Sequence, residues 1–133
     1  MGKGRKMAHK SLAEMIDKQE LARLRGDTTI REVGRYMVDH HVGSVLIMEG
    51  EELKGIFTER DALNIFVATR RNPDLTTAAD VMTDHPQTIN VNASYEDALH
   101  LMTDGGFRHV PVIDDDGKVL GVVSQRDLLE DEA

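Results

Sequence analysis

The sequence of 133 residues contains no cysteine. This absence excludes disulfide bonds, thiolate metal sites and a cysteine nucleophile, and it fits a reducing compartment. No apolar run approaches the roughly 20 residues of a membrane-spanning helix. The basic start of the chain is not followed by the apolar segment of a signal peptide. We therefore expect a cytoplasmic protein that does not enter a membrane.

Positive charge is also scarce. The chain has 16 lysines and arginines against 24 aspartates and glutamates, a net charge of -8. Broad nucleic-acid binding requires a dominant basic surface, so this balance disfavours it. Residues 1–10 are the exception, because they hold four cations and no acid. We expect a basic, flexible tail there, with an arm that touches nucleic acid or a membrane as the alternative.

One segment of the chain occurs twice, 66 residues apart. Residues 55–61 (GIFTERD) and 121–127 (GVVSQRD) both read glycine, two apolar residues, a hydroxyl residue, any residue, arginine and aspartate. Upstream, the match continues at an offset of 65, and the change of offset falls in an acidic turn, where insertions are tolerated. We expect two α+β repeats of about 60 residues that share one core, since neither half buries enough surface alone.

Each copy predicts a helix, two strands joined by a turn, and a second helix. The patterns Thr29-x-x-Glu32 and Ser94-x-x-Asp97 are capping signatures, and apolar residues then recur at helical spacing. Continuous apolar runs around a glycine-containing turn predict hairpins that are covered on both faces. The second helices are expected at 58–70 and 124–130. Shorter helices are expected at 12–16 and 78–82.

Pro111 in the second copy cannot donate a hydrogen bond to a neighbouring strand. Its strand should therefore lie at a sheet edge or carry a bulge at that point.

The repeated element permits two interpretations. In the structural one, the hydroxyl residue caps the helix, the aspartate follows three positions later, and the glycine lets the strand bend. In the binding one, the helix N-terminus and the hydroxyl hold a phosphate, and the carboxylate accepts hydrogen bonds from both hydroxyls of a ribose. The arginine adds charge for a longer phosphate chain. The residues are Thr58, Arg60 and Asp61 in the first copy and Ser124, Arg126 and Asp127 in the second.

Several stretches together resemble CBS-domain pairs, over roughly residues 12–131. They are the duplicated element, Val42-Gly43-Ser44-Val45, the segment 107–112 (FRHVPV), and Val81-Met82-Thr83 followed by Pro86-x-Thr88. The resemblance implies an α+β fold of two βαββα repeats, related by a pseudo-twofold axis, in one compact module. The first motif would span residues 11–72 and the second residues 79–133, with a linker at 73–78.

The resemblance further implies a non-catalytic regulatory module. Its two clefts would accept AMP, ADP, ATP or a related adenosyl ligand such as NAD, and it would control a separate protein. It also implies a homodimer, with apolar positions near Leu63, Phe66, Val67, Leu99 and Met102 supplying the surface. The alternative is a structural protein–protein interaction module with the same fold and no ligand.

Carried over to this sequence, Thr58 and Asp61 serve one cleft, and Ser124 and Asp127 the other. Arg108 and His109 match positions that face phosphates, and their first-copy counterparts are Gly43 and Ser44. Adenine would lie against main chain and apolar side chains around Thr88, Ile89, Val91, Val110 and Pro111. The first copy lacks the Pro-x-Thr element at 21–26, so we expect the Asp127 cleft to bind more tightly.

Neither a metal site nor a catalytic centre is expected. His40 and His41 are adjacent, so on a helix their side chains diverge by about 100°. No His-x-x-x-His pair accompanies them. Asp114-Asp115-Asp116 is interpreted as an acidic hairpin turn, because the remaining ligands of a Ca²⁺ loop are missing.

Overall fold

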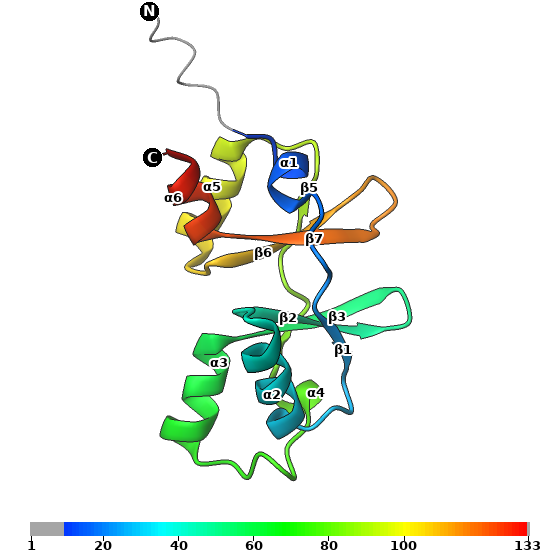
Figure 1. The fold of residues 1–133 in the computed structure, drawn as a ribbon, viewed down its shortest axis with the longest axis vertical. Helices are drawn as coiled ribbons and strands as arrows, with labels where there is room; N and C mark the ends of the chain where they lie inside the picture. Colours follow the sequence, from blue (N-terminus) through cyan, green and yellow to red (C-terminus); the bar gives the residue numbers. More distant parts are fainter. Residues whose placement is uncertain (1–9, 133) are drawn as a thin grey trace, which may run out of the picture. The chain divides into compact units, whose positions relative to one another are not determined.

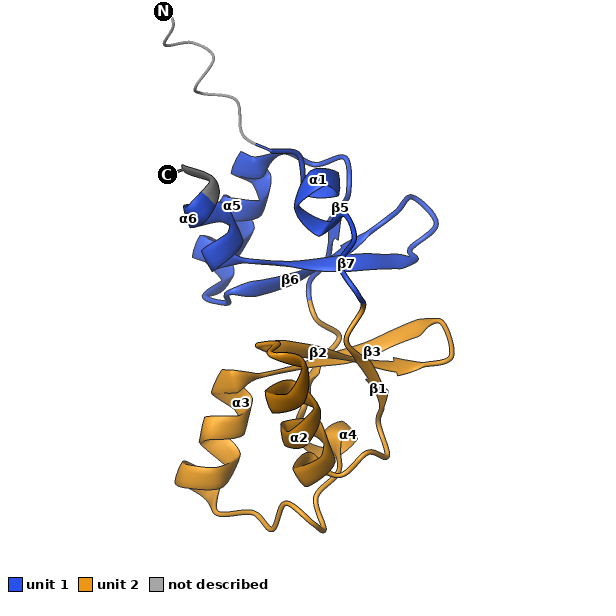
Figure 2. Cartoon of the chain, viewed as in Figure 1, with its two compact units in different colours: residues 1–20, 87–133 blue, residues 21–86 orange. Residues whose placement is uncertain are grey.

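The computed structural model describes residues 10–132 and divides into two compact units. Unit 2 is the continuous stretch 21–86, whereas unit 1 combines the residues up to 20 with those from 87 onward (Figure 2). The predicted basic tail lies outside the described residues, apart from Lys10. Within residues 10–132, none of the helices is long and apolar enough to cross a membrane.

Unit 2 is a four-stranded sheet with helices on one of its sides (Figure 1). The strand order is β1-β2-β3-β4, with β1 parallel to β2 and the other neighbours antiparallel. The elements are β1 (Arg23–Arg25), α2 (Ile30–His40), β2 (Ser44–Glu49), β3 (Glu52–Thr58), α3 (Glu59–Leu63), the π-helical η2 (Asn64–Thr69), α4 (Ala78–Val81) and β4 (Thr83–Asp84).

Unit 1 repeats this plan with a three-stranded sheet, in the order β5-β6-β7. The strand β5 is parallel to β6, and β6 is antiparallel to β7. The elements are α1 (Leu12–Ile16), β5 (Ile89–Asn90), α5 (Tyr95–Gly105), β6 (His109–Ile113), β7 (Val119–Ser124) and α6 (Gln125–Glu132).

The α+β class and the two βαββα repeats are thus confirmed, and so are the short helices near 12–16 and 78–82. The expectation of one shared core is wrong, because the buried apolar residues form two clusters, one in each unit. The predicted helix at 58–70 is α-helical only in its first part, α3, and continues as the π-helix η2. Both hairpin turns use a glycine with positive φ, Gly50 at 62° and Gly117 at 85°. Residues with a Cβ atom rarely adopt this conformation.

The long helices begin at the predicted capping residues. Thr29 accepts a hydrogen bond from the main chain of Glu32, and Ser94 accepts one from that of Asp97. One face of each helix then enters its unit's core: Ile30, Val33 and Met37 from α2, and Tyr95, Ala98 and Met102 from α5. Met102 is only 1% exposed, so its predicted place on a dimer surface is wrong.

The two short helices pack on the unit of the other repeat. The helix α1 precedes the first copy in the sequence, yet Leu12 and Ile16 belong to the core of unit 1. The helix α4 precedes the second copy, and Ala78 belongs to the core of unit 2. The sequence repeats and the compact units therefore have different boundaries. The boundaries of the compact units lie near residues 20 and 87.

The glycine of the duplicated element makes room for a segment that packs on its strand, α1 in unit 1 and the residues directly after α4 in unit 2. Neither Gly55 nor Gly121 has positive φ. A Cβ atom on Gly121 would lie 2.7 Å from Cβ of Ile16, and one on Gly55 would lie 2.8 Å from the main-chain oxygen of Thr83 as well as against Met82. Close approach, rather than a bend of the strand, is therefore what requires glycine here.

Pro111 lies in the middle strand of its sheet, at a point that β5 does not reach. The pairing of β5 with β6 begins at Val112, one residue later. In unit 2 the equivalent residue, Leu46, does donate a hydrogen bond, to the main-chain oxygen of Ala22. The expectation of an edge strand is wrong, but β6 has no β5 partner at the proline, while Pro111 pairs with Val122 of β7 on the other side. A bulge follows between Val112 and Ile113.

We predict that Gly55→Ala and Gly121→Ala each destabilise the fold by about 1–3 kcal/mol, because the added methyl overpacks a closed contact. Gly34→Ala is the matched control. It lies inside α2, and a Cβ there meets nothing within 4 Å. That change should stabilise the protein by about 0.5–1 kcal/mol through helix propensity. Urea denaturation measures all three, and equal effects at the three glycines would contradict the packing explanation.

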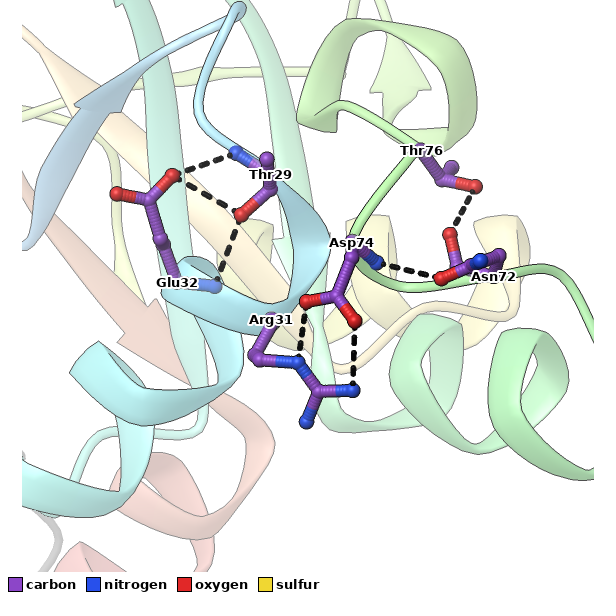
Figure 3. A network of polar contacts seen from close by, with 6 residues as sticks. All are labelled: Thr29, Arg31, Glu32, Asn72, Asp74 and Thr76. Carbon is purple, nitrogen blue, oxygen red and sulfur yellow. Dashed lines mark hydrogen bonds and ion pairs between the residues drawn. The ribbon is translucent and has the colours of Figure 1, made fainter.

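The predicted linker at 73–78 is fastened to the start of α2 (Figure 3). The main chain of Ile30 donates to Thr76 and that of Arg31 donates to Pro73, at 2.9 and 3.1 Å. The guanidinium of Arg31 also makes two parallel hydrogen bonds to the carboxylate of Asp74. Thr76, in turn, is 5% exposed and donates its hydroxyl to the main-chain oxygen of Asn72 at 2.7 Å.

The hydrogen bonds from Arg31 lower the pKa of Asp74 below its ordinary value. A carboxylate with a lower pKa in the folded state than in the unfolded chain stabilises the fold above roughly pH 4. The contribution is lost as the pH falls through the folded pKa. Asp74→Asn should therefore reduce the free energy of unfolding at pH 7, and the difference from wild type should shrink at pH 3.

Urea denaturation at the two pH values tests this prediction. Asp39→Asn, which removes an exposed carboxylate of α2, is the control. A wild-type advantage over Asp74→Asn that is as large at pH 3 as at pH 7 would contradict the role of the ion pair.

Candidate functional site

The junction between β3 and α3 holds the first candidate constellation. Thr58 donates its main-chain N–H to Oδ2 of Asp61 at 2.9 Å, and the main chain of Asp61 donates back to Oγ1 of Thr58 at 3.4 Å. The Thr58 hydroxyl also donates to Oδ2 of Asp61, at 3.1 Å. Both side chains are half-buried. The structural interpretation, a helix cap, is therefore confirmed for this copy.

The junction between β7 and α6 repeats the constellation. Ser124 donates its main-chain N–H to Oδ2 of Asp127 at 2.9 Å, and the main chain of Asp127 donates to Oγ of Ser124 at 3.1 Å. Both residues are again half-buried. One difference separates the two copies: among the described contacts, the Ser124 hydroxyl does not donate to the neighbouring carboxylate.

Capping uses only half of each carboxylate. The hydrogen bonds that described residues donate to the carboxylates of Asp61 and Asp127 all end on Oδ2. The Oδ1 atoms of both groups are left able to accept hydrogen bonds from another molecule. A carboxylate oxygen that is fixed in place in this way suits a hydroxyl donor such as that of a sugar.

The stretches before each hairpin lie beside these junctions. In unit 2, Ser44 pairs with Thr58 across the ladder, and the main chain of Glu59 donates to Gly43 at 3.1 Å. In unit 1, His109 pairs with Ser124. The main chain of Gln125 donates to that of Arg108 at 2.8 Å. Arg108 and His109 thus lie at the start of α6, in the same unit as Asp127.

The predicted adenine-contacting residues lie on β5 and β6 or next to them. Ile89 pairs with Val112, and the main chain of Val91 donates to Ile113 at 2.8 Å, which holds residues 89–91 against β6, with Thr88 directly before them. The side chains of Ile89 and Val110 are part of the hydrophobic core of unit 1. These two residues can therefore offer a ligand their main chain rather than their side chains.

The strand equivalent to β5 in unit 2 is β1, and its sequence differs. Arg23 pairs with Leu46, the counterpart of Pro111, so it occupies the place of Thr88. The side chain of Arg23 is exposed and lies 4.0 Å from Glu51. The two units thus present different groups at this position: a hydroxyl in unit 1 and a guanidinium in unit 2.

The arginines inside the duplicated element point outward. Arg60 and Arg126 are both exposed. Arg126 lies 3.7 Å from Glu130, one turn further along α6. They add positive charge near the junctions without being part of either cap.

Gln19 supports the second junction, and the sequence offered no signal for it. Its carboxamide donates to the main-chain oxygen of Val122 at 3.0 Å and accepts from the N–H of the same residue at 2.7 Å. In unit 2 the strand β4 makes the equivalent contact, with Thr83 opposite Ile56. A single side chain therefore replaces a strand at the edge of β7, two residues before Ser124.

Comparison with known proteins agrees with this geometry. The family model for the CBS domain matches residues 13–68 and 78–132. An uncharacterized protein of Methanopyrus kandleri is 38% identical over 103 residues, which are 77% of this chain and 53% of that protein. The chain thus spans about half the length of that relative.

Solved structures match over nearly the whole chain. A putative signal-transduction protein with CBS domains from Burkholderia ambifaria has a TM-score of 0.84 at 25% identity, covering 91% of this chain and 92% of that one. A CBS domain protein from Pyrobaculum aerophilum, complexed with AMP, has a TM-score of 0.81 at 27% identity, with 89% of each chain covered. The chain described here belongs to the CBS-domain family and contains two CBS motifs.

Proposed function

We propose that this protein is a regulatory sensor that binds adenine nucleotides at its two strand–helix junctions. The observation that carries the proposal is the duplicated cap, in which each aspartate is held rigidly through one oxygen and keeps the other available. The free oxygen accepts hydrogen bonds from the ribose hydroxyls. The hydroxyl residue and the main-chain N–H groups at the helix start face the phosphate.

Two findings support a nucleotide as the ligand. The Pyrobaculum relative of similar structure is complexed with AMP. In addition, cationic side chains stand near the half-buried carboxylates, Arg60 in unit 2 and Arg108 and Arg126 in unit 1. AMP and ATP are the ligands that we favour, and ADP or NAD carries the same adenosyl group.

The alternative function is a structural module that joins proteins and binds no ligand. A helix cap alone accounts for one oxygen of each aspartate, and serine, threonine or asparagine caps a helix without any acid three residues later. The caps at Thr29 and Ser94 also carry an acid three residues later, so the acid alone does not separate the two functions. We favour the sensor because a relative of similar structure is complexed with AMP. We further propose that it acts in the cytoplasm as a homodimer, has no catalytic activity of its own, and controls a separate protein.

A thermal-shift screen tests nucleotide binding directly. A ligand that binds only the folded state stabilises it by about 2.7 kcal/mol at a hundredfold excess over its Kd. For a protein of this size, the melting temperature should rise by several degrees. We expect a rise with AMP, ADP or ATP at millimolar concentration and none with inorganic phosphate or adenine alone. If no adenine nucleotide, NAD or S-adenosylmethionine raises the melting temperature, the sensor proposal is wrong and the structural module is the remaining function.

The two sites should differ in affinity, with the Asp127 site the tighter. The Ser124 hydroxyl has a proton to donate to a phosphate, whereas that of Thr58 is directed at Asp61. Arg108 stands at the start of α6, where Gly43 stands in the other unit. A charge-assisted hydrogen bond contributes about 1.5–3 kcal/mol, which is roughly tenfold or more in Kd.

Calorimetry on Asp127→Ala and Asp61→Ala separates the sites. We expect Asp127→Ala to remove the high-affinity phase and Asp61→Ala to leave it. Asp97→Ala is the matched control, because it breaks an identical cap in the same unit away from the junction. Equal losses of affinity in the two site variants, or a larger loss in Asp61→Ala, would contradict the ranking. A loss of affinity in Asp97→Ala as large as that in Asp127→Ala would indicate that the variants act through stability alone.

A further inference from the structure

We infer that Gln19 is a positioning residue of the Asp127 site, because its carboxamide holds the strand edge from which Ser124 fixes that carboxylate. The inference rests on the nucleotide binding proposed above. It adds a residue outside the duplicated element on which only one of the two sites depends. Three observations carry it: the direction of the main-chain groups on β7, the contact that Gln19 makes with them, and the way in which Gln19 is itself held.

The main-chain groups of Val122 and Ser124 lie on the same edge of β7. Residues of an antiparallel ladder turn their N–H and C=O groups alternately toward the partner strand and away from it. Val122 pairs with Pro111, which has no N–H to donate, and Ser124 follows two residues later. Both residues therefore face away from β6. On this outer edge, the N–H of Val122 donates to Gln19 at 2.7 Å. The N–H of Ser124 donates to Asp127 at 2.9 Å.

The carboxamide of Gln19 occupies this edge as a neighbouring strand would. Its Nε2 donates to the main-chain oxygen of Val122 at 3.0 Å, and its Oε1 accepts from the N–H of the same residue. A carboxylate at neutral pH keeps the acceptor and loses the donor, and alanine has neither. In unit 2 the main chain of β4 fills the equivalent place, with Thr83 opposite Ile56. Unit 1 thus relies on one side chain where unit 2 relies on main chain.

Gln19 is itself held by α1, which packs on β7 (Figure 1). The N–H of Gln19 donates to the main-chain oxygen of Ile16 at 3.0 Å. Ile16 is 7% exposed and belongs to the core of unit 1. A Cβ atom on Gly121 would lie 2.7 Å from Cβ of Ile16 and 2.9 Å from Oε1 of Gln19. The glycine therefore leaves the space in which the carboxamide reaches the strand.

This hold determines where the free carboxylate oxygen lies. The N–H of Ser124 fixes Oδ2 of Asp127, so the position of Oδ1 follows the main chain of β7. Without Gln19, the outward N–H and C=O of Val122 lose this partner, and the strand edge is released two residues before Ser124. A binding group works only when it is held within about 0.5 Å of its productive position. Loss of Gln19 should therefore weaken binding without removing any group that touches the nucleotide.

Calorimetry with AMP in chains that keep a single site tests the inference. In an Asp61→Ala chain, which keeps the Asp127 site, adding Gln19→Ala should raise the Kd for AMP about three- to tenfold. In an Asp127→Ala chain, the same addition should change the Kd by less than about twofold. Glu20→Ala, at the exposed neighbouring position, is the matched control and should change neither Kd.

Gln19→Glu separates hydrogen bonding from packing. This variant keeps the size of the side chain and the acceptor, but its carboxylate faces the main-chain oxygen of Val122 without a proton to donate. We expect it to weaken the Asp127 site at least as much as Gln19→Ala does. Wild-type affinity in Gln19→Glu would show that the side chain only fills space, which would overturn the inference.

Amide hydrogen exchange provides a readout without nucleotide. In Gln19→Ala the N–H of Ser124 should exchange faster than in the wild-type protein, because the strand edge that carries it is released. The N–H of Thr58, which Asp61 holds in unit 2, should exchange at an unchanged rate. Faster exchange at both amides would indicate a general loss of stability and would overturn the inference.

The remaining outcomes distinguish this inference from the proposed function. If the wild-type chain binds AMP and Gln19→Ala leaves both the Kd of the Asp127 site and the exchange of Ser124 unchanged, the positioning role of Gln19 is wrong and nucleotide binding stands. If the wild-type chain does not bind AMP, the proposed function is wrong, and the positioning role is overturned together with it.

Discussion

The reciprocal hydrogen bonds at each strand–helix junction are the constraint on which the rest of the structure depends. A hydroxyl residue and an aspartate three positions later each bond to the main chain of the other. This arrangement starts the helix and holds one carboxylate oxygen in place. The glycine three positions before the hydroxyl residue lets Ile16 lie close to β7 and lets Met82 and Thr83 lie close to β3, because a side chain there would displace them. Fold and candidate site thus share the same seven residues.

The same frame carries different chemistry in its two copies. The Thr58 hydroxyl donates to the carboxylate of Asp61, whereas among the described contacts the Ser124 hydroxyl donates to no carboxylate. Arg108 and His109 begin one hairpin and Gly43 and Ser44 begin the other. Such differences do not alter the backbone, so each copy keeps its fold while its preference for a ligand changes. A duplicated module can in this way hold two sites of unequal affinity.

Most of the secondary structure could be predicted from the sequence, because its signals are local. Thr29 and Ser94 mark helix starts by their own side chains, and Gly117 marks a turn by its conformational freedom. Contacts between distant segments could not be predicted. No local pattern indicates that α1 packs on the unit of the second repeat, or that the carboxamide of Gln19 replaces a strand beside Val122. Met102 was expected on an interface, since a buried and an exposed apolar position look alike in a helical pattern.

The candidate site could be predicted in part, for the same reason. The residues of each cap lie within four positions and follow from spacing. The proximity of Arg108 to the start of α6 depends on the register of β6 with β7, which the structure provides. The use of Oδ2 for the cap, which leaves Oδ1 of Asp61 and Asp127 available, is a matter of side-chain geometry that no sequence pattern contains.

Native mass spectrometry during an AMP titration tests the central claim most directly. The account predicts up to two bound AMP molecules per chain, with the first bound more tightly. It also predicts that binding is lost when Asp61→Ala and Asp127→Ala are combined in a protein that remains folded by circular dichroism. The absence of bound nucleotide in the wild-type protein at millimolar AMP, or unchanged binding in the double variant, would contradict it.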